Sequence, residues 1–177
     1  MEIRIEARVL LLVGTSEMRY AGGMGKSVYI ETSIVSYLTA QPSRDLRAAA
    51  WQQITTQWWQ LERHKYELFA SRGDPEAAER RLRVLADLPE LASGEEIERF
   101  AGKLIEDGGV PVGAEGDAFH IAIAAVHEVD YLLTWNCRHI DNAVTKPVVR
   151  SICAVMGYTC PEICTPLELL SEESSDE

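Results

Sequence analysis

The chain lacks any hydrophobic run that approaches the roughly 20 residues needed to cross a bilayer. Val9–Val13 is also too short for the apolar core of a secretory signal. Cysteine is scarce: the four cysteines lie in the C-terminal third, at spacings typical of neither a disulfide framework nor a zinc finger. These absences argue against a membrane protein and against a disulfide-stapled secreted domain. We therefore expect a cytoplasmic protein with reduced thiols.

Positive charge is in short supply as well. The formal net charge is −11, and residues 24–170 carry 21 acidic against 14 basic side chains, a net of −7. Tight nucleic-acid binding driven by counterion release needs a surplus of Lys and Arg, so we do not expect it. The negative charge is consistent with a nuclease that binds RNA through bound cations, and also with a protein that has a basic partner. Residues 171–177 hold four acids and no base, which predicts a disordered acidic tail.

The segment Gly22–Ser27 ends in Gly-Lys-Ser, which suggests a phosphate-binding loop, but the motif is incomplete. Its first glycine would fall at the position of Tyr20. A helix should follow Ser27, whereas Val28–Ile30 is strand-like. A nucleotide-binding domain is therefore the weaker alternative. We take Met24 as the expected start of the domain and residues 1–23 as an N-terminal extension outside its core.

From Met24 onward the hydrophobic periodicity alternates between strand and helix, which is typical of an α/β fold with a parallel sheet. The predicted strands are 28–30, 66–70, 131–134 and an edge strand at 162–165. The predicted helices are 33–39, 42–63, 74–88, one from Ser93 to Gly108, one beginning near Asp117, and 147–156. The second helix carries an apolar stripe of Trp51, Ile54, Trp58 and Leu61, and Ser93 with Glu96 predicts a capping box. No internal boundary appears, so we expect one domain over residues 24–170.

Two acidic residues stand at junctions where a parallel sheet places its ligands. Glu31 directly follows the strand 28–30, and Asp117 opens a later helix. Acids favour the first turn of a helix, so a capping role is the structural alternative for each. Because parallel strands end at the same edge of a sheet, we expect the two carboxylates to share a Mg²⁺ or Mn²⁺ ion there. Such a cation stabilises the charge that develops in phosphodiester hydrolysis and activates a water.

Three further positions could assist this chemistry. Asn136 follows the strand 131–134 and could orient a metal-bound water or the substrate, although Asn is also common in turns. His120 lies one helical turn beyond Asp117, where a surface or packing role is the usual one. Arg138 and His139 could contact phosphate, but a charged loop is usually solvated.

Three segments together resemble the PIN-domain nucleases, specifically the toxin-type ribonucleases of toxin–antitoxin pairs. They are Tyr29-Ile30-Glu31-Thr32-Ser33, the Asp-Ala-Phe-His-Ile-Ala run from Asp117, and the Trp-Asn-Cys-Arg-His cluster from Trp135. The resemblance covers about residues 26–170 and implies a three-layer α/β sandwich with a central parallel sheet of four or five strands. Glu31 matches the first acidic position of the family, where Asp is commoner. Asp117 matches the third position, and Asn136 falls on the fourth, where many members carry Asp.

The resemblance implies a metal-dependent endoribonuclease with an RNA substrate, a cognate antitoxin protein, and a homodimeric state. Its second acidic position has no match, because the strand 66–70 runs almost directly into Gly73-Asp74-Pro75. Glu67, Asp74 and Glu79 are nearby acids that could substitute. With that position vacant we expect a weakened nuclease. The alternative is a catalytically impaired PIN-fold binding module that engages an antitoxin or dimerises.

Overall fold

A computed structural model describes residues 25–71 and 79–171 of the chain. The elements are, in order, β1 (Lys26–Ile30), α1 (Thr32–Thr39), α2 (Leu46–Leu61), η1 (Arg63–Lys65), β2 (Tyr66–Phe69), α3 (Glu79–Ala86), α4 (Glu95–Glu106), α5 (Glu115–Val126), β3 (Tyr131–Leu133), α6 (Lys146–Met156) and β4 (Glu162–Cys164). The predictions for residues 1–23, for Asp74 and for residues 172–177 lie outside the described residues. Within the described ranges, no helix is long and apolar enough to cross a membrane.

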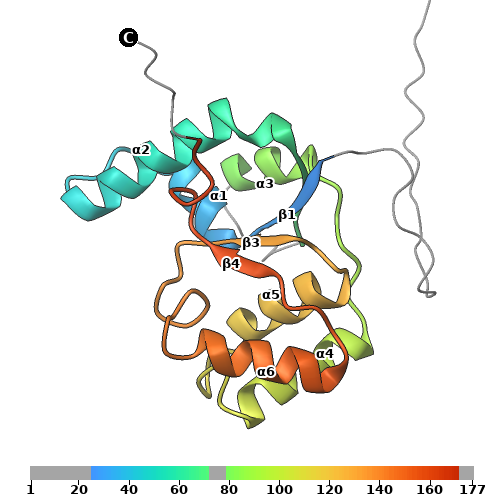
Figure 1. The fold of residues 1–177 in the computed structure, drawn as a ribbon. Coiled ribbons are helices and arrows are strands. Elements are labelled where there is room, and N and C mark those ends of the chain that lie inside the picture. Colours follow the sequence, from blue (N-terminus) through green and yellow to red (C-terminus); the bar gives the residue numbers. More distant parts are fainter. Residues whose placement is uncertain (1–24, 72–78, 172–177) are drawn as a thin grey trace, which may run out of the picture.

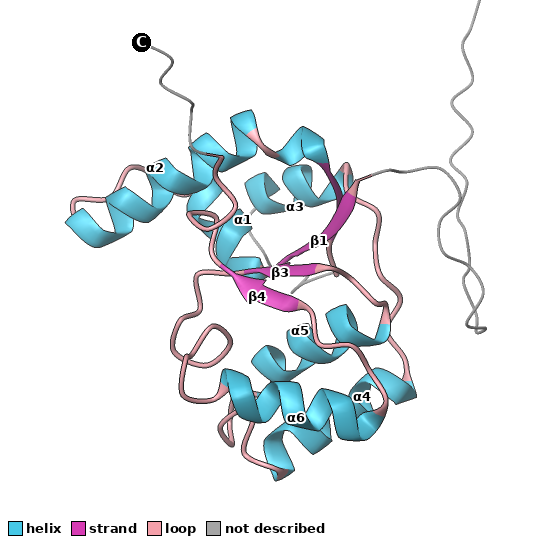
Figure 2. Ribbon diagram, viewed as in Figure 1, coloured by secondary structure: helices cyan, strands magenta, loops and turns pink. Residues whose placement is uncertain are grey.

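The four strands form one parallel sheet in the order β2-β1-β3-β4, which places β4 at an edge as predicted. Helices α1, α2 and α3 cover one face of this sheet, and α4, α5 and α6 cover the other (Figures 1 and 2). The three-layer α/β sandwich with a four-stranded parallel sheet is therefore confirmed. The register pairs Ile30 with Leu133 and Leu133 with Cys164, so three strands end level with one another.

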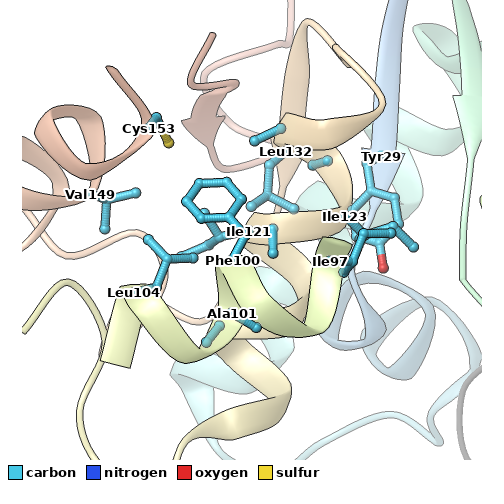
Figure 3. Close-up of a cluster of buried hydrophobic side chains, with 14 of the residues drawn as sticks. Tyr29, Ile97, Phe100, Ala101, Leu104, Ile121, Ile123, Leu132, Val149 and Cys153 are labelled. Atoms are coloured by element: carbon cyan, nitrogen blue, oxygen red, sulfur yellow. The ribbon is translucent and has the colours of Figure 1, made fainter. Parts of the chain in front are cut away.

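Alternation along the strands divides the core into two halves. Successive residues of a strand point to opposite faces of the sheet. Tyr29 and Leu132 accordingly lie in the half covered by α4, α5 and α6, whereas Val28, Ile30 and Leu133 lie in the half covered by α1 and α2. The first half is centred on Phe100, Leu104, Ile121, Ile123 and Val149, which Figure 3 shows packed together. Each such side chain contributes about 1.5–3 kcal/mol when it is fully buried.

The second half of the core depends on the tryptophans of α2. Trp58 is fully buried against the sheet, and Trp51 stacks on Trp135, which follows β3. The indole N–H of Trp135 donates to the Thr55 hydroxyl at 2.7 Å and so ties the end of β3 to α2. The predicted stripe is wrong at its last member, because Leu61 ends the helix and is exposed.

Two predicted helix starts are also wrong. The second helix begins at Leu46 rather than Pro42, because the Asp45 side chain caps it by accepting from the Ala48 N–H at 2.9 Å. Helix α4 begins after Gly94 without a side-chain cap, so the Ser93–Glu96 capping box does not form. Its glutamate instead accepts a hydrogen bond from the Tyr158 hydroxyl at 2.6 Å, a tertiary contact that local sequence cannot reveal.

Candidate functional site

Residues that follow β1 and β3 emerge side by side at the carboxyl edge of the sheet. The Glu31 N–H donates to the Leu133 carbonyl at 3.1 Å, and the Thr134 N–H donates to the Cys164 carbonyl at 3.0 Å. Glu31 stands two positions after Tyr29, so the alternation of the strand directs both side chains towards the face covered by α5. The edge of the sheet and the start of α5 therefore meet where ligands of α/β proteins bind.

The Glu31 carboxylate is held by hydroxyl groups from two segments. Its side chain is only 7% exposed. Oε2 accepts from the Thr134 hydroxyl at 2.8 Å and from the Ser33 hydroxyl. Ser33 in turn accepts from the Trp135 N–H at 2.9 Å. Glu31 occupies the N-cap position of α1, but its side chain makes no capping bond. The helix-capping alternative therefore does not describe what this carboxylate does.

His120 lies on α5 (Glu115–Val126) one helical turn after Asp117, and its side chain reaches Glu31. Its Nε2 is 3.8 Å from Glu31 Oε1 and 3.3 Å from the Thr32 hydroxyl oxygen. Burial lowers the pKa of His120, while the negative charges of Glu31 and Asp117 both act in the opposite direction. The imidazole is therefore within electrostatic reach of both carboxylates.

Two residues that the sequence analysis did not single out complete this network. The Tyr29 hydroxyl lies 2.8 Å from His120 Nδ1 and 2.6 Å from the Ser71 hydroxyl oxygen. Tyr29 is fully buried, and burial raises the pKa of its phenol, which stays protonated. Ser71 comes directly after β2 and its bridge residue Ala70. The alternation from Glu31 back to Tyr29 was the one sequence signal that could have found this contact.

Asp117 has its own histidine partner. His139 Nδ1 lies 2.8 Å from Asp117 Oδ2. The Asn136 side-chain oxygen accepts from the His139 N–H at 3.1 Å, and the Asn136 N–H donates to the Thr134 hydroxyl at 2.9 Å. Asn136 thus organises the turn that presents His139 to Asp117. Arg138, in the same turn, is exposed.

The vacant second acidic position is not filled by Glu67. In the sheet register Glu67 pairs with Ser27, four residues before Glu31. At about 3.3 Å per residue this separates Glu67 from the site by about 13 Å along the strand direction. The end of β2 that does reach the site is followed by Ala70 and Ser71, and the side chains of Asp74 and Glu79 lie outside the described residues.

Carboxylate and imidazole groups are donor types that divalent cations accept. In the described part of the chain, no group of three or more His, Cys, Asp or Glu side chains is clustered closely enough to hold a metal ion. A pair of donors is nevertheless in place: Glu31 Oε1 and His120 Nε2, 3.8 Å apart, can both bind one ion, because two bonds of about 2.1 Å span up to about 4.2 Å. A third ligand would come from Asp117. This interpretation rests on the residues themselves, because no protein-family model matches the chain and neither curated proteins nor solved structures give a significant match.

Proposed function

We propose that this chain is a metal-dependent endoribonuclease of the toxin type, which cleaves RNA and is silenced by a small antitoxin protein. The observation that carries the proposal is the 3.8 Å approach of Glu31 Oε1 to His120 Nε2, one helical turn after Asp117 on α5, at the carboxyl edge of a parallel sheet. The Glu31 carboxylate is only 7% exposed and that of Asp117 is 23% exposed, and removing such charges from water costs free energy. Binding of a cation for phosphodiester hydrolysis would offset that cost.

In this proposal Glu31 and Asp117 would hold Mg²⁺ or Mn²⁺, which would stabilise negative charge on the phosphoryl group and activate a water. The hydroxyls of Ser33 and Thr134 keep the Glu31 carboxylate in place, so that its other oxygen faces His120. Asn136 uses its side-chain oxygen in the turn. In the proposal its amide nitrogen would contact a metal-bound water or the substrate.

In the proposal, RNA is bound through the cation and through side chains near it. The net charge of −11 gives no broad basic surface. Arg138 is exposed in the turn after β3, close to the proposed cation site, and can contact a phosphate. Binding of RNA should therefore depend on the divalent cation more strongly than on monovalent salt.

The proposed protein partners are an antitoxin and a second copy of the chain. A shallow groove of about 540 Å³ lies between α1 and α2 and is lined by apolar and amide side chains, among them Tyr37, Leu38, Pro42, Gln53 and Leu61. Leu46, at the start of α2, is also exposed, so this region offers apolar surface to a partner. The four cysteines are free thiols, which fits the reducing cytoplasm as the proposed location.

A second candidate function is a binding module that keeps the fold and the antitoxin contact without cleavage. It is favoured by the hydrogen bonds that already occupy both acids: Asp117 is engaged by His139, and Glu31 by two hydroxyls. A carboxylate satisfied in this way has less to gain from a cation.

Cleavage of single-stranded RNA by the purified chain separates the two candidates. The nuclease should cut RNA with Mn²⁺ or Mg²⁺, stop when the ion is chelated, and recover when it is restored. Glu31→Gln should remove the activity, because it deletes the charge and keeps the shape. Glu98→Gln, an exposed change in α4, is the matched control and should cleave normally. Cleavage that persists in Glu31→Gln would contradict the proposal, and a wild type that never cleaves but binds its partner would establish the module.

A further inference from the structure

His120 presents one ring nitrogen to the proposed cation site and uses the other to fix its orientation. Nδ1 is 2.8 Å from the Tyr29 hydroxyl, while Nε2 faces Glu31 Oε1 at 3.8 Å. The side chain of His120 is 16% exposed. Both Glu31 hydrogen bonds that involve hydroxyls fall on Oε2, which leaves Oε1 directed at the imidazole.

The Tyr29 hydroxyl can set the tautomer of this ring. It has one proton and two neighbours, the Ser71 hydroxyl and His120 Nδ1. If Tyr29 donates to Ser71, it accepts from Nδ1–H, and Nε2 then carries a lone pair that faces the Thr32 hydroxyl at 3.3 Å and Glu31 Oε1 at 3.8 Å. Metal-bound histidines commonly donate their second N–H in this way, which fixes the ring and raises the basicity of the ligating nitrogen.

We propose that His120 binds the cation through Nε2 beside Glu31, at a site to which the described residues after β2 bring no carboxylate, and that the site consequently prefers Mn²⁺ to Mg²⁺. This inference rests on the proposed function, since it assigns a ligand to the same cation site. The described residues that follow β2 into the site are Ala70 and Ser71, neither of which is acidic. Asp117, one helical turn before His120, would be the third ligand if its bond to His139 were released.

The preference follows from the chemistry of the donors. Mg²⁺ is a hard ion that takes oxygen ligands and dehydrates reluctantly, so an imidazole is a poor ligand for it. Mn²⁺ is a larger, less hard ion that also suits carboxylates, and it accepts an imidazole beside them more readily than Mg²⁺ does. A site of two carboxylates and one imidazole should therefore bind Mn²⁺ more tightly than Mg²⁺.

The experiment is a titration of the full chain with Mn²⁺ alone, followed by electron paramagnetic resonance. Free Mn²⁺ is measured from its solution signal, and Mg²⁺ affinity from competition. Electron spin echo modulation of the bound Mn²⁺ reports directly on a coordinated nitrogen-14. We expect a bound ion with nitrogen coupling and an affinity for Mn²⁺ at least about tenfold above that for Mg²⁺.

Three variants make the test specific. His120→Gln should remove the nitrogen coupling and weaken Mn²⁺ binding about tenfold or more. The affinity for Mg²⁺ should fall much less. Tyr29→Phe keeps the ring of the tyrosine and removes the hydroxyl that orients His120, so Mn²⁺ affinity should fall about 10–100-fold. His127→Gln is the matched control, because His127 bonds the Ala92 carbonyl at the far end of α5 and should leave the coupling unchanged.

Bound Mn²⁺ without nitrogen coupling, coupling that survives in His120→Gln, or the absence of Mn²⁺ binding would each overturn the inference. If His120→Gln fails to fold, the wild-type spectrum alone still shows whether a nitrogen atom coordinates the bound Mn²⁺. RNA cleavage with bound Mn²⁺ that shows no nitrogen coupling would contradict the inference and support the proposed nuclease. Nitrogen-coupled Mn²⁺ in a chain that cleaves no RNA would support His120 as a ligand and contradict the proposed nuclease.

Discussion

His139 Nδ1 lies 2.8 Å from Asp117 Oδ2, which joins the turn after β3 to the first turn of α5. The turn is itself organised by Asn136, whose side-chain oxygen accepts from the His139 N–H. Asp117 is thus held in place by a neighbour that it would have to release to bind the proposed cation. A substitution that keeps the bond to His139 can therefore test the proposed metal-binding role of Asp117 without loss of stability.

Asp117→Asn should abolish RNA cleavage and leave the fold intact. The amide keeps the shape of the side chain and can still bond His139, but it removes the negative charge that the cation needs. Cleavage rates and melting temperatures of the variant should be measured beside Asp87→Asn, an exposed change after α3. A melting temperature close to that of the wild type with no cleavage is expected. Metal-dependent cleavage by Asp117→Asn would remove Asp117 from the site.

Thr134→Val should destabilise the protein by about 1–3 kcal/mol. The change keeps the volume of a fully buried side chain and removes a hydroxyl that donates to Glu31 and accepts from the Asn136 N–H. Urea unfolding measures the loss. Thr56→Val is the control, because the Thr56 hydroxyl bonds only the Gln52 carbonyl within α2 and its loss should cost far less. Equal stabilities for the two variants would show that the Glu31 network adds nothing to the fold.

Protonation of His120 should make the protein less stable in mild acid. Burial lowers the pKa of His120 from the ordinary value of 6.5. The unfolded chain therefore binds a proton that the folded chain excludes, and the free energy of unfolding falls as the pH drops from 6.5 towards the lowered pKa. Above pH 6.5 His120 is neutral in both the folded and the unfolded chain, so it no longer makes the free energy of unfolding depend on pH.

The measurement is urea unfolding of the wild type and of His120→Gln from pH 8 to pH 5. Over the window below 6.5, the wild type should lose up to about 1.4 kcal/mol per pH unit more than the variant. Parallel pH curves would show that His120 titrates alike in the folded and unfolded chains.

Glu67→Gln should leave Mn²⁺ binding and RNA cleavage unchanged. Glu67 pairs with Ser27 in the sheet register and so lies towards the amino ends of the strands, whereas Glu31 lies at the carboxyl edge. Isothermal titration with Mn²⁺ and a cleavage assay check this expectation. A marked loss of affinity would mean that Glu67 fills the vacant acidic position after all.

A chain that begins at Met24 should melt within a few degrees of the full-length chain. The expectation comes from the incomplete phosphate-loop motif at Gly22–Ser27 and from the position of Met24 just ahead of β1. Thermal unfolding followed by circular dichroism compares the two chains. A large drop in the melting temperature of the shorter chain would show that residues 1–23 belong to the core.

The amino-acid sequence by itself determined the layered fold. The period-two and period-3.6 hydrophobic patterns depend on which local conformation buries apolar groups, so they located the strands at Val28–Ile30 and Tyr131–Thr134 and the edge strand after Glu162. The same local chemistry placed Pro147 in the first turn of α6 and Gly157 at its end, where φ is 84°. It also placed Glu31 and Asp117 at the starts of helices.

Only the tertiary structure decided what these side chains touch. Ser93 and Glu96 have the spacing of a capping box, yet Glu96 bonds Tyr158 because α4 packs beside the segment after α6. The bonds from Thr134 to Glu31 and from Tyr29 to His120 and Ser71 join segments that are distant in the chain. Such contacts depend on strand order and register, which place three strand ends at one edge of the sheet. No local pattern encodes that juxtaposition, because it arises from burial summed over the whole core.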